Sequence, residues 1–497
     1  MLVSSKPDIG VNGSLSIEIV ILNFVQKMLR RFGSHNLRDA YSLKKHQKNE
    51  NQSMITKEEF LTHFFGTLNK ENLDYFVFGE YACLPQDTGG SDIDIFVSIH
   101  DTPAILSILR TMIDANDIQL ASYYHSSNPN WFVRLITSTW GVQIDFFGGA
   151  HVWKTACYYR PDFLRSSVIM YHGIKVLDIR VGYYLDFFKE VIHLGKVKEK
   201  YMNGFITEYQ RNSQRKAEIE IMFGKETADV IATHIADGTL ADGIPQLQRM
   251  MQQAISHGTV GKRSRLFFSK CARLFRRPGY VIAVLGTDGS GKSTIINAIT
   301  PWLDECFHHG VVYNHLRPNA IPDLGVVLGK KEAPKKGEEP KVNENPHGLN
   351  PSGFAGSLVR WGYYMIDYTF GYMKTVLPQV LTKSKVFIFD RYYYDYYIDQ
   401  RRSRTSLPHW ILRFGECFVP SPDLTLCLGG DPKKIYERKP ETSLQEVERQ
   451  TIVLRSFCKK RKRTVWIDTT LKPEKSIQMA KEAIVKMLTP RFKNVKL

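Results

Sequence analysis

The chain has 497 residues, which is too long for one hydrophobic core and predicts about three domains. Hydrophobic residues make up 43% of it and aromatic residues 12%, a composition that excludes a disordered chain. The formal net charge of +17 favours anionic partners such as nucleotides, nucleic acid or an acidic membrane surface.

The cysteines and the lengths of the hydrophobic runs indicate the cellular compartment of the protein. The seven cysteines are scattered and form no CxxC pair, so neither a disulfide framework nor a zinc site is indicated. No run approaches the roughly 18 consecutive apolar residues of a membrane span, and the first residues lack a signal-peptide pattern. We therefore expect a cytoplasmic protein, with peripheral membrane contact left open.

The first 150 residues divide into two parts. Residues 1–50 contain an amphipathic helix at 14–32 followed by a polar linker. Residues 51–150 alternate between helical and strand patterns, which predicts a small α/β domain.

Carboxylates lie within two of the strand patterns of this domain. In GGSDIDIFV, Asp92 and Asp94 point to the same face of a strand, because side chains alternate with a period of two. Asp145 lies in the apolar strand pattern GVQIDFF. Carboxylates held together on rigid strands need a cation, so the pattern predicts Mg²⁺ bound by Asp92, Asp94 and Asp145.

Residues 57–150 resemble the nucleotidyltransferase superfamily of polymerase-β-like and minimal nucleotidyltransferases. The resemblance implies that Gly79 and Ser91 bind phosphate, that Asp92 and Asp94 bind metal, and that Asp145 completes the catalytic site. The sequence departs from the pattern at Glu80, where a second glycine or a serine is usual. A carboxylate there would face the triphosphate, so an active site and a degenerate scaffold both remain open.

The middle of the chain predicts helices. Residues 151–257 are interpreted as a helical extension, and residues 258–278 as a basic linker helix. That linker is either an interfacial helix on anionic lipid or a solvated connection between domains. Its basic residues are Lys262, Arg263, Arg265, Lys270, Arg273, Arg276 and Arg277.

Residues 279–497 begin with a phosphate-binding pattern. GTDGSGKST at 286–294 satisfies GxxxxGK[ST] between the apolar strand VIAVL and the apolar helix IINAI. Lys292 is expected to reach the β- and γ-phosphates of ATP, or of another nucleoside triphosphate, and Ser293 to ligate Mg²⁺. The residues predicted to bind nucleotide are Gly286, Asp288, Gly289, Ser290, Gly291, Lys292, Ser293 and Thr294.

A second carboxylate completes this prediction. The strand pattern VFIFD ends in Asp390, followed at once by Arg391. A carboxylate at the end of a second buried strand is where the metal of such a site is expected.

Most of residues 280–490 resemble thymidylate kinase and its relatives. The exception is a Pro-, Gly- and charge-rich insert at 330–353, which we interpret as a mobile loop or lid. The resemblance rests on Asp288, the Asp-Arg-Tyr strand end and the segment PDLTLCLGGDPKKIYERKPE. It implies a doubly wound parallel sheet, a catalytic site of Lys292, Asp390, Arg391 and Arg438, and Lys439 as a second lid cation. Arg391 would contact the phosphate of the acceptor.

Tyrosines stand where the family's base-reading segment is expected. We interpret Tyr392, Tyr393, Tyr394, Tyr396 and Tyr397 as core and groove lining, which argues against thymidylate as the acceptor.

The leading hypothesis is a thymidylate-kinase-like phosphotransferase fused to a nucleotidyltransferase-like domain. Its acceptor would be a nucleotide, a sugar or a lipid-linked glycan, because similar two-domain chains are often encountered in bacterial cell-envelope polysaccharide gene neighbourhoods. The alternatives are nucleic-acid end processing, which the lack of an RNA-binding signature disfavours, and a nucleotide-sensing regulator with weak turnover. The oligomeric state is left open.

Overall fold

The computed structural model describes residues 55–125, 130–148, 151–153, 156–159, 161–255, 271, 273, 277–329 and 351–492. The helix expected at 14–32, most of the basic linker and residues 330–350 of the insert lie outside this range. Residues 53–497 belong to one compact unit.

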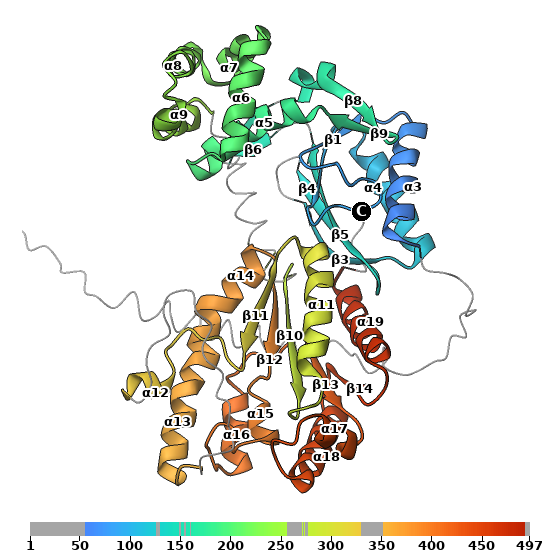
Figure 1. Cartoon of the computed structure of the whole chain (residues 1–497), viewed down its shortest axis with the longest axis vertical. Coiled ribbons are helices and arrows are strands. Elements are labelled where there is room, and N and C mark those ends of the chain that lie inside the picture. Colours follow the sequence, from blue (N-terminus) through green and yellow to red (C-terminus); the bar gives the residue numbers. More distant parts are fainter. Residues whose placement is uncertain are drawn as a thin grey trace, which may run out of the picture. The chain divides into compact units, whose positions relative to one another are not determined.

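The first α/β part is built on a mixed sheet of seven strands (Figure 1). In spatial order these are β3 (Gln119–His125), β4 (Trp131–Ile136), β5 (Gly141–Gly148), β2 (Ile93–Val97), β1 (Tyr75–Phe78), β9 (Ile174–Leu177) and β8 (Val168–Tyr171). Helices α3 (Lys57–Lys70) and α4 (Thr102–Asn116) pack on it with buried apolar side chains. Helix α3 begins with a capping box, in which Thr56 and Glu59 satisfy each other's backbone N–H groups.

The strands of this part continue beyond the boundary expected at residue 150. Strands β6 (His151–Trp153) and β7 (Ala156–Tyr159) form a hairpin, and β8 and β9 join the main sheet. The helical extension predicted for 151–257 therefore begins only at α5 (Ile179–Leu194) and continues through α6 (Glu199–Arg211), α7 (Gln214–Phe223), α8 (Lys225–Ala236) and α9 (Leu240–Ala254). Short apolar strands of three or four residues give too little periodicity to be separated from helix by sequence.

The second α/β part contains a five-stranded sheet in which every pairing is parallel, which confirms the predicted fold class. Its order is β11 (Val311–His315), β12 (Val386–Asp390), β10 (Tyr280–Gly286), β13 (Leu424–Gly429) and β14 (Thr464–Asp468). All seven residues of β10 are buried, as expected for a central strand covered on both faces.

Helices cover both faces of this parallel sheet (Figure 1). Tyr280, Ile282 and Val284 of β10 belong to the same hydrophobic core as α11 (Lys292–Phe307) and α19 (Pro473–Phe492). The alternate residues of β10 belong to a second core with η3, a π-helix (Asp367–Val376). The remaining helices are α12 (Leu324–Val327), α13 (Phe354–Ile366), α14 (Leu377–Thr382), α15 (Asp395–Ile398), α16 (His409–Glu416), α17 (Pro432–Arg438) and α18 (Leu444–Lys460).

Helices α11 and α19 also pack against strands β3–β5 of the first sheet. The Tyr280 hydroxyl donates a hydrogen bond of 2.6 Å to the carbonyl oxygen of Ala121, and the Trp302 indole donates one of 3.1 Å to that of Thr137. Gly141 of β5 lies against α11, where a Cβ would come within 2.6 Å of the Cβ of Cys306. The two sheets therefore share one hydrophobic core, with α11 between them.

Two predictions about side chains are tested by these contacts. Tyr392, Tyr393, Tyr394 and Tyr396 are buried, which confirms that they line the core. In the described part of the basic linker, the Arg273 guanidinium donates to the Thr382 carbonyl at 2.9 Å, and Arg277 pairs with Asp423 at 2.9 Å. These two cations thus bind other parts of the protein. No helix among the described residues is long and apolar enough to cross a membrane.

Candidate functional site

The phosphate-binding loop connects β10 to α11, whose first residue is Lys292. Gly289 and Gly291 adopt positive φ angles of 78° and 80°, a conformation that glycine adopts without strain. A Cβ on Gly289 would lie 2.7 Å from the carbonyl oxygen of Ile435, so the close approach of α17 also requires glycine. This geometry leaves backbone N–H groups at the start of α11 free of intrahelical partners, as anion binding requires.

Lys292 occupies the cradle that this loop forms. Its ammonium donates to the carbonyl oxygens of Gly286 and Thr287, at 3.1 and 2.9 Å. Burial and the nearby Arg391 lower the pKa of Lys292 to about 8, against the opposing effect of Asp288. The ammonium is therefore poorly neutralised in the protein alone, and an anion in the cradle would supply the missing countercharge.

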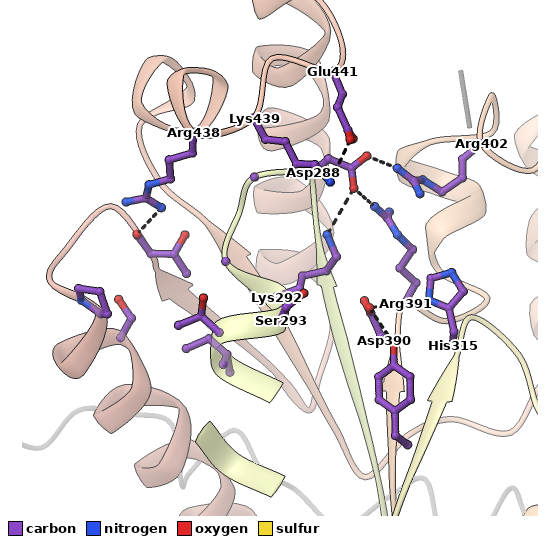
Figure 2. Close-up of a pocket in the computed structure, with 18 residues that line it drawn as sticks. Asp288, Lys292, Ser293, His315, Asp390, Arg391, Arg402, Arg438, Lys439 and Glu441 are labelled. Carbon is purple, nitrogen blue, oxygen red and sulfur yellow. Dashed lines mark hydrogen bonds and ion pairs between the residues drawn. The ribbon is translucent and has the colours of Figure 1, made fainter. Parts of the chain in front are cut away.

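Asp288 lies between two arginines from a different part of the chain (Figure 2). Arg391 donates to one of its carboxylate oxygens at 2.7 Å, and Arg402 donates to the other. Burial alone would raise the pKa of Asp288, but Arg391, Lys292 and Arg402 together lower it to about 2. The carboxylate therefore fixes both guanidinium groups beside the phosphate-binding loop.

Arg391 is 2% exposed and is held by a second carboxylate as well, since it donates to both oxygens of Asp395 at 2.9 and 3.1 Å. Its φ of 69° is in the left-handed region, which is strained for a residue with a side chain. The residue expected to contact the acceptor is thus locked in place by Asp288 and Asp395.

Asp390 ends β12 and points into the same space. The Tyr313 hydroxyl donates to its Oδ2 at 3.2 Å, and the His315 Nδ1 lies 3.7 Å from that oxygen. Burial opposes ionisation of Asp390, but His315 and Lys292 outweigh it and lower the pKa. Its Oδ1 is buried and has no hydrogen-bond partner within the described structure. An ionised oxygen in this position fits the ligand set of Mg²⁺, with the Ser293 hydroxyl lining the same space.

These groups line one cleft of about 850 Å³. Its lining residues are Asp288, Gly289, Gly291, Lys292, Ser293, Thr294, Ile295, Tyr313, His315, Asp390, Arg391, Arg402, Arg438, Lys439, Glu441, Thr469, Pro473 and Ser476. The five lysines and arginines outnumber the three carboxylates, so the cleft carries a surplus of two positive charges. Gly286 and Ser290, which were also predicted to bind nucleotide, are buried beneath the loop and are not among the lining residues.

The two predicted lid cations stand at the end of α17, on the cleft wall (Figure 2). Arg438 donates to the carbonyl oxygen of Thr469 at 2.9 Å, and the Lys439 ammonium lies 2.9 Å from the Glu441 carboxylate. Lys439 is largely exposed, so its pairing with Glu441 is a weak one that a phosphate group can displace.

The predicted acidic residues of the first part meet at the end of its sheet. Strand β2 pairs with β5 in parallel, and the register places Asp94 directly opposite Asp145. Among the described residues, Asp92, Asp94 and Asp145 are the group whose ligand atoms all lie within 4.8 Å of one another. Gly79 has a φ of 83°, and a Cβ on it would lie 3.8 Å from Asp94 Oδ2. The spacing of the three carboxylates fits a divalent cation.

Lys189 of α5 is the internal countercharge of this acidic cluster. Its ammonium lies 3.7 Å from Asp94 Oδ2, and the Asp94 carboxylate raises the pKa of Lys189. Burial, opposed by Lys189, raises the pKa of Asp94 to about 8, and burial together with Asp92 raises that of Asp145 to about 6. At neutral pH the cluster is therefore partly protonated until a cation displaces the protons.

Glu80 follows Gly79 and was expected to face the triphosphate. Its carboxylate lies 3.0 Å from the Lys200 ammonium of α6, and its side chain is 53% exposed. Lys200 is therefore a countercharge to Glu80 in this structure. Ser91, the other predicted phosphate contact, immediately precedes Asp92. Its backbone N–H donates a hydrogen bond to the carbonyl oxygen of Thr88.

The comparisons with known proteins find similarity among solved structures. No family model matches the chain. The search of curated proteins finds no match either. Among solved structures, the chain is similar to thymidylate kinase from Ehrlichia chaffeensis, with 18% identity and a TM-score of 0.28. The similarity covers 42% of this chain and 98% of that kinase. The match is weak.

Sequence reasoning missed several of the residues that complete the two sites. Arg402 reaches Asp288 from the turn after α15, His315 and Tyr313 reach Asp390 from β11, and Lys189 reaches Asp94 from α5. None of them belongs to a short motif with the residue that it contacts. Only His315, the last residue of a strand in a predicted parallel sheet, carried a signal, since such strand ends meet at one edge.

The raised pKa values predict how the acidic cluster responds to pH. A carboxyl group whose pKa is higher in the folded protein than the usual value near 4 favours folding at low pH and loses this effect as the pH rises toward the folded value. A cation must displace the proton of Asp94, so Mn²⁺ affinity should rise about tenfold per pH unit between pH 6 and 8.

Mn²⁺ titrations at several pH values, followed by electron paramagnetic resonance, check this expectation. Asp92→Asn/Asp94→Asn should remove the pH-dependent component and leave any metal binding at the phosphate-binding loop. Equal Mn²⁺ affinity at pH 6 and 8 in the wild-type protein would contradict the assignment.

Proposed function

We propose that residues 279–497 transfer the γ-phosphoryl group of ATP, or of another nucleoside triphosphate, to an acceptor held beside Asp390 and Arg391. The supporting observation is that the phosphate-binding loop and the Asp390-Arg391 strand end line a single cleft with a surplus of positive charge. The alternative, an ordinary glycine-rich turn, does not explain why the opposite wall carries a buried arginine and a buried carboxylate oxygen without a hydrogen-bond partner.

Each side chain has a role in this proposal. Lys292 exchanges its two carbonyl partners for the β- and γ-phosphates, where its charge is better neutralised. An oxygen of the acceptor attacks the γ-phosphorus, the bond to the β–γ bridging oxygen breaks, and the nucleoside diphosphate leaves with that electron pair. When the attacking oxygen is a hydroxyl, its proton is released to water. Arg438 and Lys439 offset the charge on the transferred group from the other side of the cleft.

Magnesium is the metal that this donor set fits best. Asp390 and Ser293 would hold it, and the ion would neutralise charge on the phosphates. Asp390 Oδ1 is the buried oxygen that such an ion would satisfy.

The acceptor is proposed to be a nucleotide, a sugar or a lipid-linked glycan other than thymidylate. The tyrosines that follow Arg391 are packed in the core, with Tyr392 donating to the Pro420 carbonyl and Tyr393 to the Leu412 carbonyl. They hold the strand end in place and are not free to read a base. Arg402, which shares Asp288 with Arg391, is the further cation available to an anionic acceptor.

Calorimetric titrations with ADP and AMP in the presence of Mg²⁺ test the nucleotide site. The cradle around Lys292 is placed to bind a β-phosphate, so ADP should bind at least about tenfold more tightly than AMP, a difference of about 1.4 kcal/mol. In Lys292→Ala the difference should disappear. Equal affinities for ADP and AMP in the wild-type protein would contradict a phosphate-binding cleft.

We infer a second activity, nucleotidyl transfer, at the acidic cluster. The observation that favours it is the register of β2 and β5, which brings Asp94 and Asp145 together with Asp92, so that their ligand atoms lie within 4.8 Å of one another. Two metals there would bind a triphosphate and activate an acceptor hydroxyl. With α-labelled ATP, the wild-type protein should transfer the label to an acceptor. This transfer should be lost in Asp92→Ala/Asp94→Ala and kept in Lys292→Ala.

A further inference from the structure

Helix α11 connects the two sites. It begins at Lys292 of the phosphate-binding loop and ends at Phe307, with His308 as its C-terminal cap. The helix has 16 residues and is therefore about 24 Å long. Its first turn belongs to the cleft, and its last turn reaches the acidic cluster.

His308 contacts the acidic cluster directly. The backbone N–H of Asp92 donates to His308 Nδ1 at 3.1 Å, and the same nitrogen lies 3.6 Å from Asp92 Oδ1. His308 Nδ1 is the acceptor of this hydrogen bond, and the Asp92 backbone is its donor. The imidazole therefore fixes the backbone of Asp92 and, through it, the direction of the carboxylate.

A second set of contacts leads from the same helix end to Asp145. The Arg134 guanidinium lies 5.0 Å from the centre of the Phe307 ring, as a cation–π pair. Its Nε donates to Gln143 Oε1 at 2.8 Å, and Gln143 Nε2 donates to Asp145 Oδ1 at 2.9 Å. Two neighbouring residues of α11 thus reach two of the three carboxylates.

The C-terminal half of α11 is packed closely against the first sheet. Gly141 packs against Cys306 so closely that no side chain fits between them, and the Trp302 indole is bonded to the Thr137 carbonyl. The Lys57 ammonium lies 3.0 Å from the Glu305 carboxylate. Packed interiors transmit small displacements because they have few voids to absorb them.

We propose that α11 couples the two sites, so that a nucleotide on the phosphate-binding loop holds the acidic cluster in its cation-binding arrangement, with His308 as the positioning residue. This inference rests on the proposed nucleotide site at Lys292. A ligand that orders the first turn of this packed helix also restricts its last turn, which lowers the cost of ordering Asp92 when a cation binds. By reciprocity, a cation in the cluster would strengthen nucleotide binding.

Hydrogen exchange of the full chain, measured by mass spectrometry at a constant Mg²⁺ concentration with and without ADP, tests the proposal. The Asp92 amide is itself the donor of the hydrogen bond to His308, so its exchange reports the contact directly. In the wild-type protein ADP should slow exchange in both 286–294 and 90–97, the latter by about fivefold or more, the lower end of ordinary coupling.

The matched variants are His308→Gly and His309→Gly. Both residues have positive φ angles, of 45° and 52°, so glycine relieves strain at each, and only the first substitution removes the ring that contacts Asp92. His308→Gly should keep the protection of 286–294 and lose the response of 90–97. His309→Gly should respond as the wild type does, and Lys292→Ala should lose both responses.

The other outcomes are separable. Protection of 286–294 without any response of 90–97, or a response of 90–97 that survives in His308→Gly, would overturn the coupling and leave the nucleotide site intact. A response of 90–97 in Lys292→Ala would mean that ADP binds the acidic cluster itself, which also overturns it. If 286–294 does not respond in the wild type, the proposed nucleotide site fails, and the coupling fails with it.

Discussion

Replacing Lys292 by alanine is expected to reduce phosphoryl transfer from ATP by about a hundredfold to a thousandfold. That is the usual effect of removing one preorganised group that stabilises charge developing in the transition state. The melting temperature should not fall, because burial and neighbouring arginines lower the pKa of Lys292 to about 8 and make its charge a cost to the folded protein. Initial rates with γ-labelled ATP, and thermal melts of the same preparations, measure both effects.

Lys225→Ala is the control for this experiment, because Lys225 is an exposed residue at the start of α8, far from the loop in sequence and outside the cleft lining. It should leave both the rate and the melting temperature unchanged. A Lys292→Ala protein that transfers phosphoryl groups at the wild-type rate would contradict the assignment of the cleft. A large fall in its melting temperature would show that Lys292 is needed for folding, in contrast to the role argued above.

Replacing Arg391 by alanine is expected to lower the free energy of unfolding by about 3–5 kcal/mol, the usual cost of breaking a buried ion pair by removing one partner. The side chains of Arg391 and Asp395 are 2% and 1% exposed, so the carboxylate left behind would have no access to water. Burial already raises the pKa of Asp395, against the effect of Arg391. Without the arginine that carboxyl group should bind a proton. Urea denaturation followed by circular dichroism measures the loss.

Arg110→Ala provides a matched comparison. Arg110 and Asp114 also form an ion pair four residues apart, but their side chains are 44% and 59% exposed. An exposed pair of this spacing contributes about 0.3–0.5 kcal/mol. If the two substitutions lower the free energy of unfolding equally, burial does not strengthen the ion pair of Arg391 with Asp395. The conclusion that this pair holds Arg391 in place beside the cleft would then be wrong.

The parts of both sites that sequence predicted are those that lie within one strand, one turn or one helix start. The glycines of the phosphate-binding loop, Lys292 after them and Asp390 at a strand end all follow from local rules of backbone geometry and strand order. The period of two along β2 likewise placed Asp92 and Asp94 on one face.

The parts that could not be predicted depend on which segments fold together. Nothing in the sequence pairs Asp288 with Arg402, 114 residues away, or Asp92 with His308, 216 residues away. The strands at 168–177 were assigned to a helical segment because four-residue apolar runs do not reveal their period. The salt bridge of Glu80 could not be predicted for the same reason, since its partner Lys200 comes from a later helix.

The shared core of the two α/β parts gives these distant pairs a physical basis. Helix α11 packs against the parallel sheet on one side and against strands β3–β5 on the other. More of its surface is therefore apolar than packing on one sheet would require. Its buried residues include Ile295, Ile299, Trp302, Leu303, Cys306 and Phe307. A domain that folded alone would expose part of this surface to water. The two sites are therefore parts of one folding unit.

Incubation with γ-labelled and α-labelled ATP shows directly whether the cleft transfers a phosphoryl group. The acceptors offered should be nucleotides, glycans and oligonucleotides, and the proteins should be the wild type, Lys292→Ala and Asp92→Ala/Asp94→Ala. The γ-label should move onto an acceptor in the wild type and the double variant and stay with the nucleotide in Lys292→Ala. Transfer of the γ-label that persists in Lys292→Ala, or ATP that binds at the loop and yields no labelled acceptor, would contradict phosphoryl transfer by this cleft.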